Sequence, residues 1–300
     1  MKESGLGCEI DQYFYGLFGY ADDCALLSPS REGLQLMLNL CANYFTEHGI
    51  KISVDVILEK SKTKCMAFNS PVIPIMLSLY NLVLPWVRSA IHLGHQITTD
   101  EDTSADILSS KAIFITKVHE LRQELGNQNP EVFIRLVQIY LTSMYGSNLW
   151  DLYHNSAGKL FSAWNTLIKN SFNLPFATHR HIVYNITNKT HLRVALFRRF
   201  IKFYSKLEMC SKPEIVHLFN KQKVDMRSVF GRNCIKICRE FNAENISNIE
   251  YNDVCMPDLM DESQNWRVPF LQDLLLLNDD SITDIPKKDI TEIIDFICCH

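Results

Sequence analysis

The sequence predicts a mixed α+β fold, because strand-like and helix-like patterns occupy different parts of the chain. Short apolar runs separated by turn-forming residues fill residues 4–98, and such runs are typical of buried strands. From residue 99 onward the apolar residues recur at helical spacing. With 300 residues, 47% of them hydrophobic, the chain is large enough for a packed core. We therefore expect an antiparallel sheet with one packed helix, followed by a mainly helical region.

Two apolar runs near the N-terminus flank a pair of adjacent carboxylates, Asp22 and Asp23. Aspartate is unfavourable inside strands and favourable in turns, so we expect the pair at the bend of a strand hairpin. Residues 4–10 and 13–19 are also strand-like. A rigid hairpin that carries two carboxylates can form part of a divalent-metal site for phosphoryl transfer. The simpler alternative is a solvated turn.

A helix is expected after this hairpin. Ser28 is suited to the N-cap, Pro29 to the first helical position, and Gly49 to the residue that ends the helix. The residues on its apolar face are Leu34, Met37, Leu38, Cys41, Tyr44, Phe45 and His48. We expect this face to cover the sheet, with His48 placed to interact with the negative end of the helix dipole.

Further strands are expected at residues 50–54, 64–68, 73–80 and 90–98. The stretch between Lys64 and Arg88 has no charged residue and is long enough to cross a bilayer. Three prolines within it argue against a continuous helix, so strands separated by turns are the better interpretation. We expect no membrane association.

Beyond these patterns, Tyr20-Ala21-Asp22-Asp23 resembles the Tyr-Xaa-Asp-Asp box of reverse transcriptases. Flanking segments resemble the non-LTR retrotransposon branch of that family in order and spacing: residues 4–8, 18–23, 26–30, 48–53, 60–65, 84–87 and 92–94. The resemblance covers residues 4–97. It implies a partial polymerase palm over residues 1–98 and a thumb-like helical region over residues 99–175.

The resemblance also implies a chemistry, RNA-directed DNA polymerisation. The full-length enzyme would transfer nucleotides from dNTPs to a DNA primer on an RNA template, by a two-metal mechanism with Mg²⁺. Asp22 and Asp23 would bind the metal and carry catalysis. Tyr20 would lie beneath the primer end, and Ala21 would be small enough for a tight hairpin.

Two further segments match primer-binding or nucleotide-binding parts of the family. Lys62 is the preferred residue near the incoming triphosphate, although Lys60 and Lys64 alternate with it and a solvated charged turn is an equal alternative. Leu93 and Gly94 match the primer-grip hairpin, where a glycine permits close approach of the backbone to the primer. An ordinary strand or bulge glycine is the alternative.

The resemblance lacks one part of the metal site, an Asp from an earlier palm strand. Asp11 is the only Asp before Tyr20, and it matches no upstream motif of the family. No segment matches the fingers. We therefore expect a chain that begins within the palm, binds Mg²⁺ weakly and does not polymerise DNA by itself. The alternatives are a catalytically dead nucleic-acid-binding remnant, or a vestigial fragment without selected function.

The helical part is expected to contain helices at residues 107–125, 130–152, 159–173 and 191–209. The aromatic residues at helical spacing are more typical of a core than of base-stacking platforms: Tyr140, Tyr145, Trp150 and Trp164.

Charge is distributed unevenly behind a net charge of −4. Residues 169–239 hold fifteen Lys/Arg and three Asp/Glu. Residues 240–300 hold three Lys/Arg and fourteen Asp/Glu. This asymmetry predicts a basic helical region at 176–239 that binds polyanions, and an acidic helical tail at 240–300. Two mutually neutralising faces are the alternative. The candidates for contact with a nucleic-acid backbone are Arg193, Arg198, Arg199, Lys202 and Lys206.

Ten cysteines occur without the spacing of a disulfide framework or of a complete zinc site. Cys234 and Cys238, and the Cys298-Cys299-His300 end, lack further ligands. Reduced thiols predict an intracellular protein. The sequence does not distinguish the nucleus from the cytoplasm.

Overall fold

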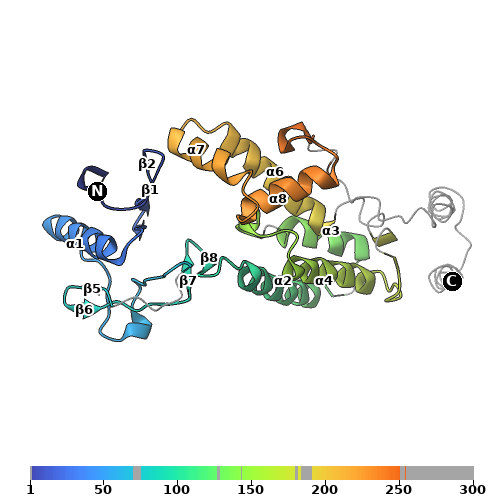
Figure 1. The fold of residues 1–300 in the computed structure, drawn as a ribbon. Coiled ribbons are helices and arrows are strands. Elements are labelled where there is room, and N and C mark those ends of the chain that lie inside the picture. Colours follow the sequence, from blue (N-terminus) through green and yellow to red (C-terminus); the bar gives the residue numbers. More distant parts are fainter. Residues whose placement is uncertain are drawn as a thin grey trace, which may run out of the picture. The chain divides into compact units, whose positions relative to one another are not determined.

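The computed structural model describes residues 2–69, 76–126, 129–142, 144–179, 182–183, 191–250 and 254. The chain divides into two compact units, which Figure 1 shows in sequence colours. The N-terminal unit comprises Met1–Asp106 with Lys212–His217, and the helical unit comprises Ile107–Ser211 with Leu218–His300. The mixed α+β class is confirmed, since small antiparallel sheets lie near the N-terminus and helices follow.

The described strands of the N-terminal unit form four separate two-stranded hairpins. Each is antiparallel and joined by a two-residue turn. The pairs are β1 (Glu9–Ile10) with β2 (Tyr13–Phe14), β3 (Leu17–Tyr20) with β4 (Asp23–Leu26), β5 (Ser78–Leu79) with β6 (Leu82–Val83), and β7 (Ser89–His92) with β8 (His95–Thr98). Antiparallel pairing was expected, but the described strands do not join into the one continuous sheet that the sequence predicted.

Two of the strands that the sequence predicted are absent from the described structure. Residues 50–54 form no strand, because side chains satisfy their backbone: Thr63 Oγ1 donates to the Ser53 carbonyl at 2.8 Å, and Ile52 N–H donates to the Tyr80 hydroxyl at 3.4 Å. Residues 64–68 contribute one isolated parallel bridge, between Cys65 and Trp86. The first part of the strand expected at 73–80 lies outside the described residues.

The helix α1 (Arg31–Glu47) begins later than the sequence predicted. Ser30 is the N-cap, and its side chain accepts a hydrogen bond from Gly33 N–H at 3.1 Å, so Ser28 and Pro29 precede the helix. The helix ends as expected, with Gly49 in the left-handed conformation at φ 72°. The Nδ1 atom of His48 lies 2.8 Å from the Tyr44 carbonyl oxygen, which places this ring at the last turn.

A small core holds α1 in place. Met37, Leu38 and Ala42 are buried on α1, whereas Tyr44, expected on the same face, is 59% exposed. Leu38 and Ala42 belong to a cluster with residues of the later hairpin and its flanks: Cys65, Leu77, Leu79 and Leu84.

The helical unit has the larger of the two hydrophobic cores. The described helices after the last hairpin are α2 (Ser104–Leu125), α3 (Pro130–Tyr140), α4 (Asn155–Ser171), α6 (Leu192–Glu208), α7 (Pro213–Gln222) and α8 (Val229–Glu240). The described residues also form short 3₁₀ turns, η1 (Lys2–Ser4) and η2 (Leu58–Lys60) in the N-terminal unit and η3 (Ser147–Leu149) and η4 (Ile246–Asn248) in the helical unit.

The four aromatic residues expected in this core separate into two pairs. Trp150 and Trp164 are 1% and 0% exposed, as predicted, but Tyr140 and Tyr145 are 67% and 71% exposed. The helix expected over residues 130–152 instead ends at Tyr140. Positive φ values at Met144 and Gly146 then redirect the chain, so that Tyr145 does not continue the apolar face of α3.

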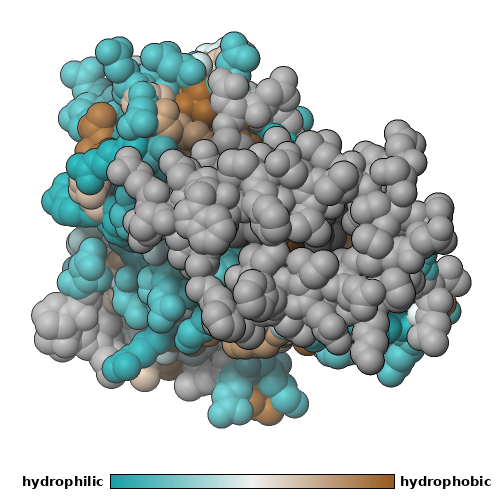
Figure 2. Space-filling view, turned by 90° about the vertical axis from the view of Figure 1, so that its right-hand side faces the viewer, coloured by the Kyte–Doolittle hydropathy of each residue, from teal (hydrophilic) through white to brown (hydrophobic). Residues whose placement is uncertain are grey.

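On the face shown in Figure 2, the visible described residues are mostly hydrophilic. In the view of Figure 2, teal residues predominate around smaller brown patches. No helix within the described ranges is long and apolar enough to cross a membrane. Seven described cysteines carry free thiols. Most of the acidic tail expected at 240–300, including Cys298-Cys299-His300, lies outside the described residues.

Candidate functional site

The carboxylate pair lies on the β3–β4 hairpin. Tyr20 pairs with Asp23 in the ladder, which leaves Ala21 and Asp22 as the two turn residues. Asp22 is therefore at the bend, as expected, while Asp23 is the first residue of β4. Both carboxylates are exposed, and Tyr20 beside them is 69% exposed.

The turn of this hairpin differs from those of the other three. Its first residue, Ala21, has φ 51°, and Asp22 is not among the described residues with positive φ. In the other turns both residues have positive φ: Asp11 and Gln12, Tyr80 and Asn81, and Leu93 and Gly94. A left-handed conformation at a non-glycine residue costs of the order of 1 kcal/mol and is often found at functional sites. Ala21 thus has a strained conformation next to the two carboxylates, but turn residues of the other hairpins are strained as well, so strain does not distinguish this turn.

Asp22 and Asp23 could supply some, but not all, of the ligands that a metal ion needs. Among the described residues, no group of three or more His, Cys, Asp or Glu side chains is placed to hold one. Mg²⁺ keeps several waters and is usually fixed by one or two carboxylates together with substrate phosphates. The exposed pair can therefore contribute ligands to a shared Mg²⁺ site, and binding by the pair alone is weak.

The other family-matched residues of the N-terminal unit are also accessible. Lys60, Lys62 and Lys64 are all exposed, so their positions do not favour one of the three. Leu93 and Gly94 form the turn between β7 and β8, with φ of 49° and 79°. Gly94 therefore occupies a position of a tight turn that requires positive φ.

The five basic residues of α6 are not equivalent. Arg193 Nη2 donates to Glu240 Oε2 at 2.8 Å, and the guanidinium lies 4.8 Å from the centre of the Phe197 ring. The Arg193 charge is thus largely neutralised inside the unit. Lys202 and Lys206 are exposed, and Arg198 and Arg199 are half-buried.

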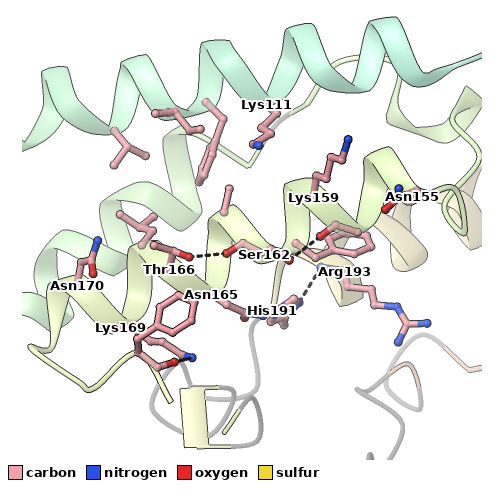
Figure 3. A pocket seen from close by; sticks show the side chains of 18 of the residues that line it. Lys111, Asn155, Lys159, Ser162, Asn165, Thr166, Lys169, Asn170, His191 and Arg193 are labelled. Carbon is pink, nitrogen blue, oxygen red and sulfur yellow. Dashed lines mark hydrogen bonds between the residues drawn. The ribbon is translucent and has the colours of Figure 1, made fainter. Parts of the chain in front are cut away.

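A groove in the helical unit, which sequence reasoning missed, gathers a different set of cations. It has a volume of about 1080 Å³ and runs between α2 and α4, near the start of α6 (Figure 3). None of the described residues that line it is acidic. Its basic residues are Lys111, Arg122, Lys159, Lys169 and Arg193.

Two of these cations are available to a ligand. Lys111 on α2 and Lys159 on α4 point into the space between the two helices (Figure 3), and neither forms an ion pair or hydrogen bond with another described residue. By contrast, Arg122 donates to Ser171 Oγ at 3.0 Å, and Lys169 Nζ donates to the Phe176 carbonyl at 2.5 Å.

The N-termini of two helices also line the groove. His154 caps α4 and His191 caps α6, each through a ring nitrogen that accepts a backbone N–H. Because Nδ1 of His191 accepts from Arg193 N–H, its Nε2 donates to Asn165 Oδ1 at 2.8 Å, which is the pattern of a neutral imidazole. The positive ends of the two helix dipoles add to the lysines in favouring an anion.

Small polar residues on α4 keep the groove open. A Cβ atom on Gly158 would meet nothing within 4 Å. The hydroxyls of Ser162 and Thr166 donate to carbonyls one turn earlier, both at 2.9 Å, which leaves their oxygen lone pairs facing outward as acceptors. The lining therefore combines basic and polar groups with apolar side chains such as Phe114 and Phe161.

No family model matches the chain, and neither a curated protein nor a solved structure was found to match it.

Proposed function

We propose that this chain is part of a non-LTR retrotransposon reverse transcriptase, with nucleotidyl transfer as the reaction of the full-length enzyme. The observation that carries this proposal is the β3–β4 hairpin, which presents Tyr20-Ala21-Asp22-Asp23 with both carboxylates exposed. Adjacent carboxylates that are exposed at the tight turn of a hairpin suit a site where metal and phosphates meet.

In this proposal the hairpin supplies only some of the ligands for Mg²⁺. When bound, the metal would stabilise charge on the transferred phosphate and activate the primer hydroxyl. Asp22 and Asp23 would hold it, and Tyr20 would support the primer end. Template RNA, DNA primer and dNTP are the proposed partners, in an intracellular setting.

A Mg²⁺ titration followed by NMR tests the hairpin directly. We expect weak, millimolar binding that shifts signals of the β3–β4 turn and that Asp22→Asn removes, while Glu9→Gln, an exposed acid on β1, leaves it unchanged. Absence of any shift at the hairpin would contradict the proposal.

The isolated chain is not expected to extend a primer on an RNA template, because two exposed carboxylates hold Mg²⁺ too weakly. Extension by wild type that Asp22→Asn abolishes would show that the chain completes a metal site, and would overturn this expectation while supporting the family assignment.

A second function, nucleic-acid binding without catalysis, is favoured by the groove of the helical unit. We infer that its lysines contact phosphates, since several cations gather there and no acid is among its described lining residues. Lys111→Gln should weaken binding of an oligonucleotide about tenfold, the loss of one charge-assisted contact. Lys117→Gln is the matched control, because Lys117 is exposed on α2 outside the groove. Equal effects of the two variants would place binding elsewhere.

A vestigial fragment remains the third candidate. It predicts neither Mg²⁺ binding at the hairpin nor salt-sensitive nucleic-acid binding.

A further inference from the structure

The form of nucleic acid that the groove accepts follows from where its cations lie. Lys111 and Lys159 project from opposite sides into the space between α2 and α4 (Figure 3). Cations on both sides of a hollow can contact one phosphate backbone that passes between them. A duplex presents its backbones on the outside of a rigid cylinder, and a rigid cylinder does not enter a hollow between two packed helices.

The length of the groove suits a short segment of one strand. Asn155 and Asn170 line its two ends on α4 (Figure 3), and fifteen residues of helix span roughly 22 Å. Single-strand sites on small domains start at about four nucleotides. Neither amide is engaged in a hydrogen bond with another described residue, so each can bond to base edges or sugars.

An exposed aromatic ring completes the lining. Phe176, which follows α4, is 86% exposed and borders the groove. Lys169 Nζ lies 5.3 Å from the centre of its ring and is hydrogen-bonded to the Phe176 carbonyl, which holds the residue in place. A single exposed aromatic residue is ordinary on a protein surface. Here it lies beside cations, and a basic groove with an accessible ring is the combination that binds single strands by backbone contacts and base stacking.

We propose that the groove between α2 and α4 binds a single-stranded nucleic-acid segment, with its backbone between Lys111 and Lys159 and one base stacked on Phe176. This proposal rests on the nucleic-acid binding proposed above and specifies its ligand. It also distinguishes two basic surfaces of the helical unit, since the strand would lie along α2 and α4 and not along the basic face of α6.

The experiment uses the full chain and a fluorescent 12-nucleotide pyrimidine oligomer as RNA and as DNA, alone and annealed to its complement. Fluorescence anisotropy at low salt is expected to show at least tenfold tighter binding of the single strand. Phe176→Leu should weaken single-strand binding at least about fivefold and leave duplex binding unchanged, because it removes a stacking platform. Tyr140→Leu is the aromatic control, since Tyr140 is 67% exposed and lies outside the groove.

The possible results separate the two proposals. Equal or tighter binding of the duplex, still reduced by Lys111→Gln, would overturn the single-strand inference and preserve nucleic-acid binding. Single-strand binding that is insensitive to Phe176→Leu and Lys111→Gln would also overturn the inference, because the strand would then lie elsewhere. No binding of either form would overturn both. Because Phe176 is so exposed, its variant should retain the wild-type circular dichroism spectrum, which checks that the fold is intact.

Discussion

Single glycines in two helices show how differently the same substitution acts in this fold. Gly231 in α8 lies against the backbone of the preceding loop, where an added Cβ atom would be 2.2 Å from the Asp225 carbonyl oxygen and 2.5 Å from that of Gln222. Gly158 in α4 has open space at the same position. One glycine is required by close packing of backbone, and the other leaves the groove open.

Alanine substitution should therefore change stability in opposite directions. Gly231→Ala forces backbone to move and should lower the free energy of unfolding by about 1–3 kcal/mol or more. Gly158→Ala should raise it by about 0.5–1 kcal/mol, since alanine favours the helix and meets no neighbour. Urea unfolding of both variants measures this. Destabilisation by Gly158→Ala, or a neutral Gly231→Ala, would contradict the packing.

Buried thiols give stability a dependence on alkaline pH. Burial raises the pKa of Cys234 to about 12 and that of Cys65 to about 11, from an ordinary value of 9.0. The unfolded chain thus loses these protons at lower pH than the folded chain does. Stability should be fully present below pH 9 and fall as pH rises from 9 toward 12.

Urea unfolding at pH 7.5, 9 and 10 follows this decline, and a Cys65→Ala/Cys234→Ala variant separates the thiols from other groups. The variant should lose less stability between pH 9 and 10 than wild type does. Identical pH profiles would mean that the two thiols are not protected in the folded state.

At the scale of elements, local chemistry sets where a helix begins. The sequence offers Ser28 and Ser30 before α1, and the structure uses Ser30, whose hydroxyl accepts from Gly33 N–H. Ser28 Oγ instead accepts from Ser30 N–H at 3.3 Å, outside the helix. The two serines have the same intrinsic N-cap propensity, so propensity alone does not predict which of them caps the helix.

Alanine at each serine distinguishes them. Ser30→Ala should cost about 1 kcal/mol of the free energy of unfolding, the usual loss of an N-cap, whereas Ser28→Ala should cost less. Chemical denaturation of the two variants provides the comparison. A larger loss of unfolding free energy for Ser28→Ala than for Ser30→Ala would indicate that Ser28 is the N-cap, as the sequence predicted.

The sequence predicted those elements whose signals are local. The Asp22 turn, the end of α1 at Gly49 and the burial of Trp150 and Trp164 follow from turn chemistry and helical periodicity. Joining of the hairpins into one sheet was not predictable locally, because ladder partners are distant in the chain. Tyr145 was misplaced because a turn after α3 interrupted a helix that periodicity alone would extend.

At the scale of the whole molecule, the groove was missed because its cations are isolated in the sequence. Lys111 and Lys159 lie on different helices, and both precede the basic stretch at residues 169–239. Only the packing of α2 near α4 brings them together. The charge distribution instead drew attention to α6, where Arg193 is paired with Glu240. A count of charges along a chain does not reveal which are already neutralised in the fold.

In the proposed complex, the lysines of the groove contact the phosphates of a nucleic acid. The most direct test is the salt dependence of binding to a single-stranded oligomer, measured for wild type and for Lys111→Gln/Lys159→Gln. The slope of log K against log salt should be less steep in the double variant by about 1.4, since each phosphate contact on a single strand contributes about 0.7. A slope identical to that of wild type would contradict the claim.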